Sequence, residues 1–184
     1  MGIESRIFEL FKTKGRARYF GEPVSQTHHA LQTAFFARQS GATSSLVVAA
    51  LLHDIGHLLH GDETAAYFGI DVRHEDIGAN WLDVYFGPEV SEPVRLHVAA
   101  KRYLCATDHG YLGCLSEASI LSLELQGGPF GTEDANVFAT SEWADDAIKL
   151  RLWDDRAKIL DLEVPSLDSY ADDLRARGLL TGHI

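Results

Sequence analysis

The fold is decided by the stretch Leu51-Leu52-His53-Asp54-Ile55-Gly56-His57, which lies within a longer apolar run that begins at Leu46. Such a run predicts a buried helix, and it places an adjacent histidine and aspartate inside the core. Burying His53 and Asp54 without partners is unfavourable by several kcal/mol for a polar group and by much more for a charge. The stretch therefore requires either a metal ion or a hydrogen-bond network around these two side chains.

The rest of the chain predicts an all-α protein of about seven helices, because period-2 alternation is not sustained anywhere. Helices are expected over residues 3–14, 26–40, 46–57, 72–84, 93–104, 116–126, 142–155 and 169–177, with loops over residues 105–114 and 130–140. Serines stand before several of these helices, so we expect N-caps at Ser25, at Ser44 or Ser45, and at Ser141. Pro93 is expected to open its helix.

Length and composition predict one soluble domain. The chain has 184 residues, a hydrophobic fraction of 46% and a net charge of −11. We expect a single domain over residues 1–184, with a core of about residues 19–160 and a C-terminal helical tail of about residues 161–184. The negative charge disfavours nucleic acid or an anionic membrane as a partner over a broad surface. The sequence shows neither a signal-peptide pattern nor an apolar run of transmembrane length, which favours a cytoplasmic location.

The placement of the histidines points to a metal site. One histidine falls in each of four predicted helices, and two aspartates accompany them: His29, His53, His74, His97, Asp54 and Asp154. Helix bundles build metal sites from side chains on facing helices. Imidazole and carboxylate ligands together suit Fe, Mn, Co, Ni or Zn. A single helical histidine is more often an ordinary surface or core residue, and that interpretation is kept for His28, His60, His109 and His183. The six residues together favour a metal site.

The ordered series His29, His53-Asp54, His74, His97 and Asp154 resembles the H…HD…H…H…D pattern of the HD-domain superfamily. The form with two extra histidines implies a helical bundle with a central dinuclear metal site. By this resemblance, His29, His53, Asp54 and Asp154 hold one metal, whereas His74, His97 and a bridging Asp54 hold the other. A carboxylate has two oxygens, so a bridging role is chemically natural for Asp54.

Most HD-domain proteins are phosphohydrolases, but five stretches of this chain resemble the PhnZ-type di-iron oxygenases. They are Tyr19–Glu22, His53–His57, His97–Leu104, Ser116–Pro129 and Arg151–Asp154. The resemblance implies two iron ions as an Fe(II)/Fe(III) pair. It also implies O2-dependent cleavage of the C–P bond of a 1-hydroxyalkylphosphonate to phosphate and a carboxylic acid. The expected substrate is 2-amino- or 2-trimethylammonio-1-hydroxyethylphosphonate, which would give glycine or glycine betaine.

Hydrogen-bond donors are expected beside the metals, because several polar residues stand one helical turn from a predicted ligand. Lys101 follows His97 by one turn, and Arg151 lies on the same face as Asp154. Such donors suit a phosphonate or phosphate dianion. A surface position is the commoner fate of Lys and Arg in general. The resemblance assigns phosphonate contacts to His57, Lys101, Ser119 and Arg151, with Ser122 and Gln126 as further members of the pocket.

Two further parts of the chain are assigned to the site. The resemblance implies that Tyr19 closes an iron coordination position until substrate displaces it, and that Glu22 steadies this loop and helps to sense substrate. Residues 58–73 are expected to line the C2 end of the substrate, where an acid or an aromatic ring would favour a cation. The residues that could do so are Asp62, Glu63, Tyr67, Phe68 and Asp71.

Two alternatives stay open from the sequence. One is a metal-dependent HD phosphohydrolase that acts on a nucleotide or another phosphomonoester and needs no oxygen. The other is an HD domain that binds metal or ligand without catalysis. The oxygenase is favoured because a gate such as the Tyr19 loop protects a reactive oxygen species, which a hydrolase does not form.

Overall fold

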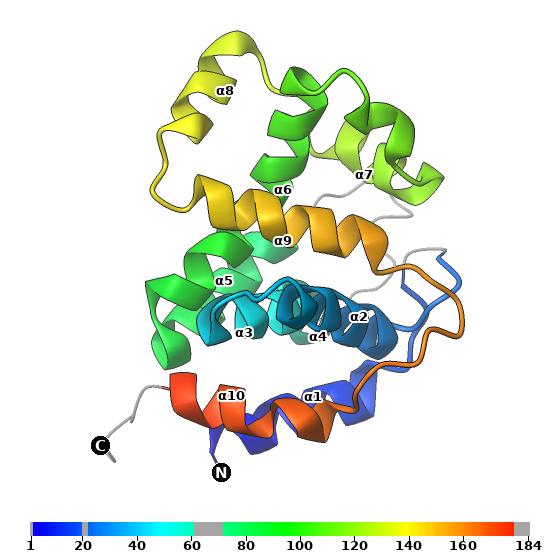
Figure 1. The fold of residues 1–184 in the computed structure, drawn as a ribbon, viewed down its shortest axis with the longest axis vertical. Helices are drawn as coiled ribbons and strands as arrows, with labels where there is room; N and C mark the ends of the chain where they lie inside the picture. The colour runs from blue at the N-terminus through cyan, green and yellow to red at the C-terminus, as the bar shows by residue number, and fades with distance from the viewer. Residues whose placement is uncertain (1, 20–21, 61–71, 179–184) are drawn as a thin grey trace.

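The computed structural model describes residues 2–19, 22–60 and 72–178, and every regular element within them is helical (Figure 1). The elements are α1 (Ile3–Lys14), α2 (Gln26–Gln39), α3 (Ser44–Leu52), α4 (Ile55–His60), α5 (His74–Phe86), α6 (Pro88–Thr107), the 3-10 helix η2 (Tyr111–Cys114), α7 (Glu117–Leu125), α8 (Thr132–Ala139), α9 (Ala144–Arg156), the 3-10 helix η3 (Leu167–Tyr170) and α10 (Ala171–Arg177). The all-α prediction is confirmed. None of these helices is long and apolar enough to cross a membrane.

The helices form three layers along the long axis of the molecule (Figure 1). α1 and α10 lie side by side at one end, α2 to α5 occupy the middle, and α9 crosses above them toward α6, α7 and α8. The main apolar core runs through the middle layer and reaches α1, α9 and α10 on either side; Leu52, Leu82 and Leu150 in it are fully buried. This core fixes the relative positions of the helices that carry the predicted ligands.

The predicted central helix is broken in the middle. α3 starts at Ser44 with Thr43 as its N-cap and ends at Leu52, and α4 begins only at Ile55. The Nδ1 atom of His53 lies 2.9 Å from the carbonyl oxygen of Ala50 and hydrogen-bonds to it. In a continuous α-helix, that carbonyl would accept the hydrogen bond from the backbone N–H of Asp54. The expectation of one helix over residues 46–57 with a serine cap was therefore wrong. The break leaves His53 and Asp54 at the joint between two helices.

Several other boundaries differ from the predictions. α6 begins at Pro88 in its first turn, and Pro93 lies inside the helix. Residues 132–139 form α8 rather than a loop, because acidic residues occupy its first turn and Phe138 is buried against α6 and α9. α9 begins at Ala144, and Ser141 accepts a hydrogen bond from the N–H of Trp143 just before it. Ser25 does cap α2, by accepting from the N–H of His28.

Candidate metal centre

The predicted ligands converge in the middle of the helical bundle. His29 comes from α2, His53 and Asp54 from the joint between α3 and α4, and His74 from the start of α5. His97 and Asp154 project from α6 and α9. All six are buried, with exposed fractions between 0% and 8%. Residues far apart in the sequence therefore form one enclosed cluster of imidazoles and carboxylates.

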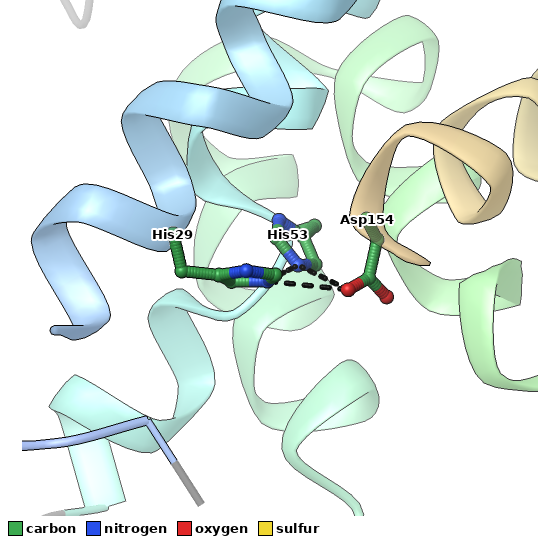
Figure 2. Close-up of side chains that lie close together, drawn as sticks. All are labelled: His29, His53 and Asp154. Atoms are coloured by element: carbon green, nitrogen blue, oxygen red, sulfur yellow. Dashed lines mark hydrogen bonds and ion pairs between the residues drawn. The ribbon is translucent and has the colours of Figure 1, made fainter. Parts of the chain in front are cut away.

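The first ligand group comprises His29, His53, Asp154 and one oxygen of Asp54. The Nε2 atoms of His29 and His53 are 3.2 Å apart, and His29 Nε2 lies 3.2 Å from Asp154 Oδ1. Asp54 Oδ2 lies 3.3 Å from His53 Nε2 and 3.7 Å from His29 Nε2. Figure 2 shows His29, His53 and Asp154 pointing at one another from three different helical segments.

The second ligand group comprises His74, His97 and the other oxygen of Asp54. The Nε2 atoms of His74 and His97 are 3.2 Å apart. Asp54 Oδ1 lies 3.3 Å from His74 Nε2 and 3.7 Å from His97 Nε2. The two oxygens of Asp54 therefore face two different pairs of histidines, which is the arrangement that a carboxylate bridge between two cations requires.

The outer nitrogens of the four histidines fix how the rings face the centre. The Nδ1 atoms of His29, His53 and His97 lie 2.7–2.9 Å from the backbone carbonyls of Ala157, Ala50 and Val94, respectively. His74 Nδ1 instead lies 3.4 Å from a carboxylate oxygen of Glu75. A carbonyl needs a donor, so the Nδ1 atoms of His29, His53 and His97 carry a proton, and Nε2 is the ring atom that faces the centre.

The centre fits a cation, because its inward-facing atoms are acceptors. In the part of the chain that the structure describes, Asp54 Oδ2 and Asp154 Oδ1 are buried and receive no hydrogen bond. Burial disfavours the charged His53 ring, yet the negative charge of Asp54 raises the pKa of His53 to about 9, so the carboxylates favour a positive charge at this ring, which either a proton or a metal ion can supply. The cluster thus attracts positive charge, and metal ions at the two groups would satisfy the lone pairs and the carboxylates together.

A cluster of polar donors, made of Lys101, Arg151, Ser119 and Ser122, adjoins the ligands. Lys101 and Arg151 are buried, with exposed fractions of 2% and 5%, so neither is a surface cation. Lys101 Nζ donates to Ser122 Oγ over 2.7 Å. Burial, and then the charge of Arg151, lowers the pKa of Lys101 to about 7. Ser119 is also buried, on the same helix as Ser122.

Arg151 is held in place by carboxylates on both sides. Its Nη1 atom donates to Asp154 Oδ2 over 2.8 Å, and its Nε and Nη2 atoms donate to Asp155. The hydroxyl of Tyr111 donates to Asp155 and accepts from Arg151 Nε. Arg151 therefore connects Asp154 of the first ligand group to Asp155 and Tyr111. Asp155 and Tyr111 were missed by the sequence analysis, although the spacing of Asp155 from Arg151 already suits a helical ion pair.

His57 lies closer to the second ligand group than predicted. Its ring stacks on His74 with centroids 4.0 Å apart, and one of its nitrogens could join Asp54 and His74 around a metal. Burial, and then the neighbouring His74, lowers the pKa of His57 well below its usual range. A neutral His57 can bind metal or donate to a substrate oxygen. In the remaining part of the predicted pocket, Gln126 Oε1 is buried and accepts no hydrogen bond within the described residues.

The loop before α2 reaches the first ligand group. The Tyr19 ring stacks on His29, with centroids 3.9 Å apart and an angle of 14° between the planes. Burial, and then the negative charge of Asp54, raises the pKa of Tyr19 well above its usual value. Glu22 accepts a hydrogen bond from Ser116 Oγ over 2.6 Å. Phe20 and Gly21 between them lie outside the described residues, as do His183 and the predicted C2-end residues Asp62, Glu63, Tyr67, Phe68 and Asp71.

Comparisons with known proteins agree with this geometry. Residues 27–124 match the HD domain family. The chain is 42% identical over 172 residues to a hydroxymethylphosphonate dioxygenase from Gimesia maris, which covers 92% of this chain and 85% of that protein. It is 41% identical over 168 residues to a 1-hydroxy-2-(trimethylamino)ethylphosphonate dioxygenase (glycine-betaine-forming) from Leisingera caerulea, covering 88% and 83% of the two chains. An uncharacterized protein, L432, from Acanthamoeba polyphaga mimivirus is 32% identical over 167 residues, or 89% and 76% of the two chains.

Proposed function

We propose that this chain cleaves the C–P bond of a 1-hydroxyalkylphosphonate with O2. The chain belongs to the HD-domain family and, within that family, to the PhnZ-type oxygenases. The products are phosphate and a carboxylic acid. The observation that carries the proposal is the position of Asp54, whose two oxygens face two histidine pairs beside the buried Lys101. Two relatives with named activities are both phosphonate dioxygenases.

We assign the two ligand groups to a pair of iron ions. His29, His53, Asp54 and Asp154 would hold one, and His74, His97 and Asp54 the other. When bound as an Fe(II)/Fe(III) pair, the metals supply the redox chemistry with O2 that no protein side chain provides. Histidine and carboxylate ligands suit iron. The hydrogen bonds at the Nδ1 atoms of His29, His53 and His97, and the ion pair between His74 and Glu75, hold the rings in orientation, so that the site is ordered before substrate arrives.

The protein binds the phosphonate through the buried donors beside the ligands. Lys101 supplies a positive charge, and Ser119 and Ser122 supply hydroxyl groups from one face of α7. Arg151 is already paired with Asp154 and Asp155, so its main contribution is to position Asp154 and to add positive potential. These contacts place C1 of the substrate next to the metal ligands. Tyr19, which stacks on His29, covers the first ligand group until substrate displaces it, so that oxygen chemistry begins only with substrate bound.

The C2 substituent is proposed to be cationic, as in an aminoethyl or trimethylammonioethyl substrate. A net charge of −11 favours a cationic group over an additional anion. The two phosphonate dioxygenases named above differ at this position, since one acts on a hydroxymethyl and the other on a trimethylamino compound. A direct comparison of hydroxymethyl-, 2-amino-1-hydroxyethyl- and 2-trimethylammonio-1-hydroxyethylphosphonate therefore decides the substituent.

The test of this function is anaerobic reconstitution with iron, followed by electron paramagnetic resonance with and without each of the three phosphonates. We expect a mixed-valence signal that changes when substrate is added, and phosphate release that requires O2. Release of phosphate from ordinary phosphomonoesters without O2 would instead establish a phosphohydrolase. Tight binding of phosphonate with no turnover would establish a non-catalytic binding domain.

A further inference from the structure

The segment that follows α9 is anchored to α2 on both sides of one lysine. The carbonyl of Ala157 accepts a hydrogen bond from His29 Nδ1 over 2.8 Å. Two residues later, the backbone of Ile159 makes two hydrogen bonds with the side chain of Gln32, at 3.1 Å and 2.7 Å. Gln32 is fully buried. The position of Lys158 is therefore set by its two neighbours, one of which is bonded to a predicted metal ligand.

The burial of this segment is inverted relative to the usual pattern. The side chain of Lys158 is only 12% exposed, whereas Ile159 and Leu160 next to it are 47% and 61% exposed. Lysine is almost never buried without polar partners, and isoleucine and leucine usually are buried. The chain thus directs a cation inward at the expense of two apolar side chains. Such an arrangement indicates that the charge has a use inside.

The ammonium group of Lys158 reaches the predicted phosphonate pocket. Lys158 Nζ donates to Ser119 Oγ over 2.7 Å, and it lies 3.4 Å from Ser116 Oγ. It also pairs with Glu22 Oε1 at 3.6 Å. Ser116 Oγ in turn donates to the same oxygen of Glu22. Lys158 therefore connects the loop that carries Tyr19 and Glu22 with the first turn of α7.

Lys158 and Lys101 make matching contacts on α7. Ser119 and Ser122 stand one turn apart, and each hydroxyl accepts from one lysine, Lys158 and Lys101 respectively. After burial and Arg151, the charge of Lys158 is among the causes that lower the pKa of Lys101, so the two cations lie close enough to repel each other. A bound dianion between them would relieve this repulsion.

We propose that Lys158 is a further substrate-binding residue, which together with Ser119 binds one oxygen of the phosphonate while Lys101 and Ser122 bind another. This inference rests on the proposed function. Glu22 is the partner of Lys158 before substrate binds, and the phosphonate then takes over part of that contact. Lys158 thereby adds the second positive charge that matches a dianion.

The test compares Lys158→Met with Lys149→Met, a matched control on exposed α9 surface where the lysine pairs only with Asp146 among the described residues. The affinity of the iron-loaded enzyme for hydroxymethylphosphonate and for inorganic phosphate is measured anaerobically by calorimetry. We expect Lys158→Met to weaken both ligands about 10- to 100-fold, as for loss of a charge-assisted hydrogen bond, at unchanged iron content. Lys149→Met should bind like the wild type, and Lys158→Arg should retain most of the affinity.

An unchanged affinity in Lys158→Met overturns the inference, even if turnover falls, because Lys158 would then act only on the Glu22 loop. If the methionine variant does not fold or loses iron, Lys158→Gln carries the same test, since it removes the charge and keeps a polar, although shorter, side chain. The proposed function is judged separately, by O2-dependent phosphate release from the wild type. Weaker phosphate binding in the variant without such release in the wild type would support the anion site and refute the oxygenase.

Discussion

Asp54 directs one carboxylate oxygen toward His29 and His53 and the other toward His74 and His97. No other residue in the described part of the chain contacts both ligand groups in this way. Its effect on catalysis is therefore expected to exceed that of any single histidine. The position at a helix joint matters as much as the residue type, because a continuous helix would give the Asp54 backbone a different orientation.

Replacing Asp54 by Asn tests the shared carboxylate. The amide keeps the volume but turns one of the two oxygens into a donor, so one ligand group loses its anionic oxygen. We expect the iron content to fall by about half and the turnover to fall at least about 100-fold. Iron analysis and phosphate release check this. Asp146→Asn, at a half-exposed position on α9 away from the ligands, is the control. Full iron loading of the Asn variant would contradict a bridging role.

Lys101 gives a prediction about protons. Burial lowers the pKa of Lys101 to about 7, so at pH 8 most of the free enzyme carries a neutral amine. A phosphonate dianion stabilises the ammonium form, so substrate binding should take up a proton at pH 8, and affinity should weaken as the pH rises above 7. Calorimetry in buffers of different ionisation enthalpy measures the uptake. Lys101→Met should show none, and a buffer-independent enthalpy in the wild type would refute the prediction.

Some residues of the site could be predicted from the sequence, and others could not. Each metal ligand interrupts an apolar or helical pattern, and Lys101 and Arg151 share a helical face with one of them. Lys158 has no such signal, because it lies after the end of α9 where helical periodicity stops. Its inward direction depends on the bonds that His29 and Gln32 make to its neighbours. Contacts of this kind arise only when distant segments meet.

At the scale of helices, the close approach of α4 and α5 positions the second ligand group. A Cβ atom on Gly56 would lie 2.0 Å from the carbonyl oxygen of His74 and 3.0 Å from the N atom of Gly78. Both contacts are with backbone atoms, which cannot move aside as a flexible side chain could. The absence of a side chain at Gly56 therefore allows His74 to come within reach of Asp54.

Gly56→Ala should force α4 and α5 apart. We expect a loss of about 1–3 kcal/mol in the free energy of unfolding, as for overpacking in a core, together with weaker iron binding at the second ligand group. Denaturant unfolding and iron titration measure the two effects. Gly113→Ala, where a Cβ would meet nothing within 4 Å, is the matched control. Normal iron binding in a destabilised Gly56 variant would show that the contact serves stability alone.

Helix existence could be predicted better than helix boundaries. α1, α2 and α7 agree with the prediction to within a residue or so, since a serine cap, or in α1 a regular apolar face, marks their limits. The break at His53 and the helix α8 were not predicted. The first follows from a side chain that bonds to its own backbone, and the second from burial of Phe138 against α6 and α9. Neither cause has a signature in local periodicity.

At the scale of the whole molecule, the two ligand groups join four helices and the joint between α3 and α4. Without metal, the centre holds buried carboxylates and inward-facing lone pairs that lack donors. Metal binds the folded chain much more tightly than the unfolded one, because the ligands are scattered along the sequence. Metal must therefore contribute to the stability of the bundle.

Removing the metal should lower the midpoint of thermal unfolding. At a metal concentration about 100 times the Kd, metal binding adds about 2.7 kcal/mol to the free energy of unfolding. For a chain of this size, that corresponds to a decrease of about 5–10 °C. Calorimetry or circular dichroism before and after anaerobic chelation checks it, with re-addition of iron as the control for reversibility. Equal midpoints with and without metal would indicate that the bundle does not depend on its centre.

The order of the ligands along the chain has a consequence for biosynthesis. The second ligand group is complete once residue 97 has been added, whereas the first also needs Asp154, on the penultimate α-helix of the described chain. Arg151 and Lys158, which belong to the proposed phosphonate-binding residues, are also synthesised late. During translation, an emerging chain can thus acquire its second set of ligands well before the first. Substrate affinity should appear only when α9 docks, so that an unfinished chain exposes no working site for oxygen chemistry.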